Sequence, residues 1–237
     1  MKNKNENFHE GIESFLDAND EIRKILKKYR VKIIEVDQCP EIKRDFMDIG
    51  ADRLDYGIRD YYGAVGRETR FGLKVLENVR LKNRSIVFTN KLTAREYALT
   101  ALKAMWKVIY EPKVAVVYQS LVEIIRSGLS GGWLKNEDMN KDDQYAFDVI
   151  KKNKNKFPEK YSKIFEKSFV AKEVKKDAGY NFHHVKLRAR YFDPLVDRGG
   201  KLINLSKFDK IYLNTLEINR KIFEKRKKGV YIKVEFK

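Results

Sequence analysis

The sequence of 237 residues predicts an α+β fold, with a helix-rich N-terminal two-thirds and a small antiparallel sheet formed mainly by the C-terminal third. Two patterns support this prediction. Apolar residues recur every three or four positions through most of the chain up to residue 174, which is the period of amphipathic helices. Beyond Gly179 apolar and polar residues alternate, which is the period of strands with one buried face.

Residues 1–110 are expected to be mostly helical, with two short strands. Apolar stripes predict helices near residues 8–16, 22–29, 42–54 and 71–79. Short runs rich in β-branched residues predict strands over residues 31–36 and 85–88.

The clearest helix is predicted to begin at Thr93, because Thr93 and Glu96 have the spacing of a capping box. Pro112 should end this helix and supply the first residue of the next one. That second helix is expected to end at Gly128. Two consecutive amphipathic helices joined at Pro112 predict a helical hairpin.

The rest of the chain is expected to begin with an exposed glycine-rich connection and two further helices, over residues 141–152 and 158–174. Two strands, 182–192 and 201–205, should then form a hairpin with a generous loop. Ser206 and Asp209 resemble a second capping box, which predicts a helix that reaches the basic run before Gly229. Residues 230–236 alternate and predict the last strand.

The domain organisation that follows has a mainly helical region, residues 1–130, and a basic α+β region, residues 131–237. The sequence leaves open whether the two form one continuous domain. No internal repeat is evident in the sequence.

Charge is the strongest feature of the composition. The chain has 51 Lys and Arg against 34 Asp and Glu, a formal net charge of +17. Residues 151–237 alone contain 25 basic and 10 acidic residues, so nearly all of the excess lies in this third. A concentrated positive charge of this size predicts attraction to a polyanion.

The composition also excludes several classes of protein. No apolar run approaches the roughly 18 residues that a membrane-spanning helix needs, and the N-terminus lacks the apolar core of a secretory signal. The single cysteine, Cys39, excludes an internal disulfide and a zinc site built on paired thiolates. We therefore expect a protein with no membrane partner and no bound cofactor, located in the cytoplasm, or in a virion if a phage encodes it.

A basic stripe is the first candidate site. In a strand, Lys186, Arg188 and Arg190 would project from one face, roughly 6–7 Å apart, close to the phosphate spacing of a nucleic-acid strand. The second cluster of candidate nucleic-acid contacts comprises Lys225, Arg226, Lys227 and Lys228. Nearby aromatic residues, Phe182, Tyr191 and Phe192, could stack on bases, although Tyr191 is expected to pack inward. The alternative is a solvated face whose helix-end lysines only complement the helix dipole.

A magnesium-dependent nuclease is the second hypothesis. Glu235 and Lys237 have the E-x-K spacing of nuclease sites, in which a carboxylate holds Mg²⁺ and the lysine positions water or phosphate. Asp193, Asp197 or Asp209 would supply the second carboxylate. Magnesium is the cofactor only under this hypothesis.

A serine hydrolase is the third and least favoured hypothesis. The glycine-rich stretch that contains Ser130 matches G-x-S-x-G, with Asp142 or Asp143 and then His183 or His184 in hydrolase chain order. The helical periodicity before Gly128 disagrees with the buried strand that this motif requires.

The function that the sequence predicts is that of a non-catalytic, basic, nucleic-acid-associated or assembly protein. It would be a structural subunit of a phage or viral particle, or part of a ribonucleoprotein. Its basic surface would meet either nucleic-acid phosphates or an acidic protein partner, such as another subunit of the assembly.

Overall fold

A computed structural model describes residues 19–30, 49–66, 69–176, 179, 181–185, 191–227 and 229–237. The fold is α+β, as predicted. The helices are α2 (Asp20–Lys28), α3 (Ala51–Val65), α4 (Thr69–Glu77), α5 (Lys91–Ala104), the π-helical turn η2 (Met105–Ile109), α6 (Pro112–Ser130), α7 (Asp143–Lys152), α8 (Glu159–Glu166) and α9 (Lys210–Lys227). The strands are β1 (Val79–Lys82), β2 (Ser85–Phe88), β3 (Phe169–Val174), β4 (Phe182–Val185), β5 (Leu195–Arg198), β6 (Lys201–Asn204) and β7 (Val230–Phe236).

The first sheet has four strands in the order β1-β2-β5-β6. Its two hairpins, β1-β2 and β5-β6, are antiparallel, and β2 and β5 join them in parallel. Residues from both sides of position 130 therefore share this sheet. The main apolar core lies between this sheet and helices α3, α4, α5 and α9.

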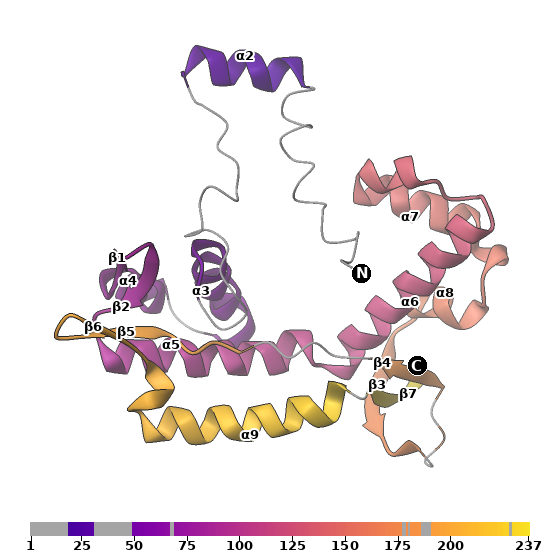
Figure 1. Cartoon of the computed structure of the whole chain (residues 1–237). Coiled ribbons are helices and arrows are strands. Elements are labelled where there is room, and N and C mark those ends of the chain that lie inside the picture. Colours follow the sequence, from indigo (N-terminus) through magenta and orange to yellow (C-terminus); the bar gives the residue numbers. More distant parts are fainter. Residues whose placement is uncertain are drawn as a thin grey trace.

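The second sheet has three antiparallel strands in the order β3-β7-β4. A separate apolar cluster connects its inner face to α6 and α8; it includes Val116, Ile164, Ile232 and Val234. α9 runs from the end of the first sheet to the start of β7, and so links the two sheets (Figure 1).

α5 begins earlier than predicted, and Thr93 is not its N-cap. The side chain of Asn90 accepts the N–H of Thr93 at 3.0 Å, so Asn90 caps the helix and Thr93 lies buried in the first turn. The carboxylate of Glu96, the other residue of the predicted capping box, pairs with Lys74 of α4 at 2.7 Å.

We expect Asn90→Ala to lower the free energy of unfolding by about 0.5–2 kcal/mol, because it removes the acceptor for an orphan amide. Urea denaturation followed by circular dichroism measures this change. Asn90→Ser keeps a capping oxygen and is the matched control, expected to stay close to the wild type. Equal stability of Asn90→Ala and the wild type would assign no capping role to this residue.

The predicted helical hairpin at Pro112 is wrong. Pro112 does open α6, as expected, but α6 leads away from the end of α5 rather than folding back along it (Figure 1). α6 also continues to Ser130, beyond the predicted end at Gly128. Gly128 is needed for another reason: a Cβ there would lie 2.7 Å from the Cβ of Leu134.

The strand pairing of the C-terminal third also differs from the prediction. Residues 158–174 do not form one helix, because α8 ends at Glu166 and β3 follows. β6 pairs with β5 through a tight turn at Gly199 and Gly200, which have positive φ angles. β4 belongs to the other sheet, so it does not pair with β6. The last strand, β7, occurs where the alternation predicted it.

Other predictions cannot be compared with the structure. The expected helix near residues 8–16 and the expected strand at 31–36 lie outside the described residues.

Candidate nucleic-acid interface

The two faces of the three-stranded sheet differ sharply in chemistry. β7 is the central strand, and its residues Val230, Ile232 and Val234 are buried on the inner face. The residues between them, Tyr231, Lys233 and Glu235, therefore point to the outer face. Lys233 and Glu235 are exposed and Tyr231 is partly exposed.

Two lysines lie directly opposite each other on this outer face. The antiparallel register of β3 and β7 pairs Lys172 with Lys233, Val174 with Tyr231 and Val170 with Glu235. Residues paired in this way have their Cβ atoms about 5 Å apart. We call the set formed by Lys172, Tyr231 and Lys233 the outer-face triad.

The electrostatics of the triad favour an anion. Two like charges directly opposite each other destabilise a strand pair, and a bound anion between them would relieve the repulsion. Glu235 lies 3.4 Å from Lys233 and offsets part of that charge. Its side chain is 61% exposed, so water screens this pair, as it also screens the repulsion between the two exposed lysines.

More basic residues surround this sheet. Lys175 and Lys176 follow β3 and are exposed. Lys225 and Lys227 lie in the last turn of α9, which leads through Gly229 into β7, and both are exposed. Lys227 also pairs with Glu224. The predicted contact Lys228 lies outside the described residues.

Arg226, another predicted nucleic-acid contact, is committed to contacts within the protein. Its guanidinium pairs with Glu173 of β3 at 2.7 Å and donates to the carbonyl of Tyr110 at 3.2 Å. It also lies over the ring of Trp106, 5.2 Å from the ring centroid. With only 14% of its side chain exposed, Arg226 ties the end of α9 to β3 and η2.

The basic stripe lies in a part of the chain that the structure does not describe. Lys186, Arg188 and Arg190 lie outside the described residues, directly after β4 in the sequence. β4, the strand just before the stripe, pairs with β7 on the side opposite β3. It is therefore an edge strand of the sheet that carries the triad.

The aromatic residues predicted near the stripe are partly accounted for. Tyr191 packs inward, as expected, with its ring stacked on Phe223 at 6.1 Å. Phe192 is buried in the main core and so does not present its ring to a ligand. The side chain of Phe182 lies outside the described set.

The structure does not bring the proposed nuclease residues together. Asp209 lies just before α9 and Glu235 lies in the strand after it, so a helix of 18 residues, about 27 Å long, separates the two positions. Glu235 and Lys237 are exposed near the end of β7. Across the described part of the chain, no three His, Cys, Asp or Glu residues are grouped so that they could hold a metal.

Each aspartate considered as the second carboxylate has a structural partner. Asp193 accepts hydrogen bonds from the backbone and hydroxyl of Ser206, and Asp197 pairs with Lys82 at 2.7 Å. Burial opposes ionisation of Asp209, but the N–H of Tyr212 and the charges of Arg95 and Lys91 outweigh it and lower its pKa.

Ser130 does not have the environment of a hydrolase nucleophile. It lies in the last turn of α6, where its hydroxyl donates to the carbonyl of Ser127 at 3.3 Å. The motif requires a sharp turn from a strand into a helix, whereas a helix precedes Ser130. The match to G-x-S-x-G therefore reflects the end of a helix, and this correction removes the hydrolase hypothesis.

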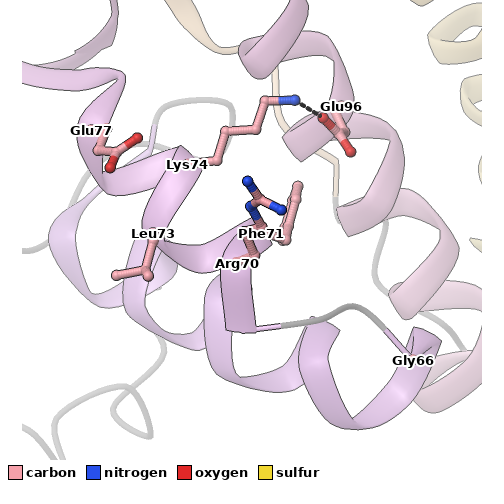
Figure 2. Close-up of a pocket in the computed structure, with 7 residues that line it drawn as sticks. All are labelled: Gly66, Arg70, Phe71, Leu73, Lys74, Glu77 and Glu96. Atoms are coloured by element: carbon pink, nitrogen blue, oxygen red, sulfur yellow. Dashed lines mark hydrogen bonds and ion pairs between the residues drawn. The ribbon is translucent and has the colours of Figure 1, made fainter.

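A cavity that sequence reasoning missed opens between the end of α3, α4 and α5. Its volume is about 710 Å³, and Figure 2 shows the side chains that line it. Arg70 and Lys74 supply positive charge, whereas Glu77 and Glu96 supply negative charge, and the Lys74–Glu96 ion pair crosses it. Among the described residues that line the cavity these charges balance, whereas the outer-face triad has an excess of positive charge.

Sequence reasoning also missed the triad, because it assigned β3 to a helix. The alternation of β7 already indicated that Tyr231 and Lys233 share a face. The position of Lys172 opposite Lys233 depends on pairing between segments about 60 residues apart, for which the sequence has no local signal.

Two further findings concern membrane-spanning helices and similarity to known proteins. No helix in the described ranges is both long and apolar enough to cross a membrane. The chain is similar to an uncharacterised protein, YdhJ, of Bacillus subtilis strain 168, with 24% identity over 239 residues that span 99% of this chain and 71% of YdhJ. No family model and no solved structure matches the chain.

Proposed function

We propose that the protein is a non-catalytic nucleic-acid-associated protein that contacts phosphates through the outer face of its three-stranded sheet. The observation that carries this proposal is the direct pairing of Lys172 with Lys233 on an exposed sheet face. More exposed lysines are close to these strands in the chain: two directly follow β3, and two lie in the last turn of α9, before β7. The excess of positive charge on this surface would supply the attraction to phosphates that dominates non-specific nucleic-acid binding.

The charge distribution supports a polyanion more than an acidic small molecule. Exposed basic residues lie where β3 ends and β7 begins: Lys175 and Lys176 follow β3, and Lys225 and Lys227 precede β7. Phosphates repeat along a nucleic acid, so a ligand of this kind can satisfy several separated cations at once. An acidic protein partner is the alternative occupant, and it is distinguished by the binding experiment below.

The test compares two double variants with the same change in net charge. The first variant, Lys172→Glu with Lys233→Glu, reverses the charge of the two lysines of the triad. The second, Lys141→Glu with Lys152→Glu, reverses the charge of two exposed lysines elsewhere. Fluorescence anisotropy with a labelled oligonucleotide, titrated at several salt concentrations, measures affinity and its salt dependence. We expect the first variant to bind at least tenfold more weakly, with a salt slope smaller by about two units. The second variant should bind nearly as the wild type does.

Three outcomes would contradict the proposal. Equal losses in the two double variants would show that only the net charge matters. Wild-type binding by the triad variant would show that this face does not contact phosphate. Cleavage of the oligonucleotide that requires Mg²⁺ and is lost in Glu235→Gln would support a nuclease instead.

A further inference from the structure

The third member of the triad, Tyr231, lies beside both lysines. It is two residues before Lys233 on the same face of β7, which places the two side chains about 7 Å apart along the strand. Lys172, opposite Lys233, is a diagonal neighbour of Tyr231 at a similar distance. One partly exposed aromatic ring therefore adjoins two cations on one open surface.

An aromatic ring adds an interaction that the lysines cannot make. Bases stack on aromatic side chains with little preference for sequence, because every base has a π-face. Val174, directly opposite Tyr231, forms a cross-strand pair of the kind that holds an aromatic ring on a sheet. The triad thus combines a stacking surface with two cations beside it.

A duplex cannot use this combination. Its base faces are already stacked on one another, so Tyr231 would have no base to contact. The three-stranded sheet is also a poor fit for the major groove of a duplex. The major groove, about 12 Å wide, admits a helix or a two-stranded ribbon. Here three strands about 4.8 Å apart, together with their side chains, form a wider surface.

We infer that the outer face of the β3-β7-β4 sheet binds single-stranded nucleic acid in preference to duplex, with Tyr231 stacked on a base and Lys172 and Lys233 on neighbouring phosphates. This inference rests on the proposed function, because it assumes that the face contacts nucleic acid. It adds the class of ligand and a residue that the charge argument does not use.

The experiment measures the binding of oligothymidine and of the oligothymidine–oligoadenosine duplex to the full chain. The variants are Tyr231→Leu, Tyr231→Phe and, as a matched control, Tyr118→Leu at an exposed tyrosine of α6. The wild type should bind the single strand more tightly. Tyr231→Leu should lose about five- to 100-fold in affinity for the single strand and keep its affinity for the duplex. Tyr231→Phe retains a ring and should behave as the wild type, as should Tyr118→Leu.

The outcomes separate this inference from the proposed function. Equal affinity for both probes, unchanged in Tyr231→Leu, would overturn single-strand selection but leave phosphate binding intact. A parallel loss in Tyr118→Leu would overturn the specific role of Tyr231. No binding of either probe by the wild type would overturn the proposed function and this inference with it. Circular dichroism of each variant establishes that the fold is retained.

Discussion

Asp209→Ala should lower the free energy of unfolding by about 2–4 kcal/mol. The side chain of Asp209 is only 1% exposed, and its carboxylate accepts the N–H of Tyr212 at 3.0 Å, so it caps α9. The other carboxylate oxygen lies 3.4 Å from both Lys91 and Arg95. The substitution would remove the cap and leave two cations near the positive end of a helix dipole. Chemical denaturation of the full chain measures the loss.

Asp209→Asn separates the two contributions. Asparagine still caps a helix, so this variant should lose only the part of the stability that depends on the negative charge. The pKa of Asp209 is lower in the folded protein, so its charge contributes stability above the ordinary aspartate pKa of about 3.9. That contribution disappears as the pH falls through the lower, folded-state pKa.

The stability difference between the wild type and Asp209→Asn should therefore be constant near neutral pH and shrink in strong acid. A difference that grows as the pH falls would contradict the assignment of a depressed pKa. Wild-type stability of Asp209→Ala would show that neither the cap nor the ion pairs matter.

The sequence revealed elements whose signals are local. The alternation of β7 and the proline that begins α6 were sufficient to predict both elements, because each depends on the residues within it. The hairpin β1-β2 escaped notice because its turn residues, Asn83 and Arg84, have positive φ angles without a glycine. Hairpin turns with two positive φ angles usually contain glycine, so this turn lacked the expected signature.

The candidate site depends on contacts that the sequence cannot show. The sequence predicted Thr93 as the cap of α5, but Asn90 caps it, and Glu96 pairs with Lys74, a residue of another helix. β3 follows a helical stripe and becomes a strand because β7 pairs with it. Strand formation of this kind depends on neighbours far along the chain more than on intrinsic preference.

Arg226 illustrates how a basic run can mix two roles. In the sequence it is one of four consecutive cations, and nothing local distinguishes it from Lys225 or Lys227. In the structure its position on α9 turns it towards Glu173 and Tyr110, whereas its neighbours face solvent. Replacing Arg226 should therefore lower the stability of the fold substantially, as replacing Asp209 should.

Arg226→Ala should lower the free energy of unfolding by about 2–3 kcal/mol, because it removes a charge-assisted pair, a hydrogen bond and a cation–π contact together. Arg226→Lys should recover only part of this, since an ammonium cannot span both acceptors as the planar guanidinium does. Lys225→Ala is the matched surface control and should change stability by less than about 0.5 kcal/mol.

In nucleic-acid binding, Lys225→Ala should have a larger effect than Arg226→Ala, the opposite of their order in stability. In conditions where both variants remain folded, Lys225→Ala removes an exposed cation and should flatten the salt dependence by up to about one unit. Arg226→Ala should leave that dependence unchanged, because the guanidinium is mostly buried and already pairs with Glu173. A flatter salt slope in Arg226→Ala than in Lys225→Ala would reverse this assignment. It would show that the end of α9 opens to release Arg226 when nucleic acid binds.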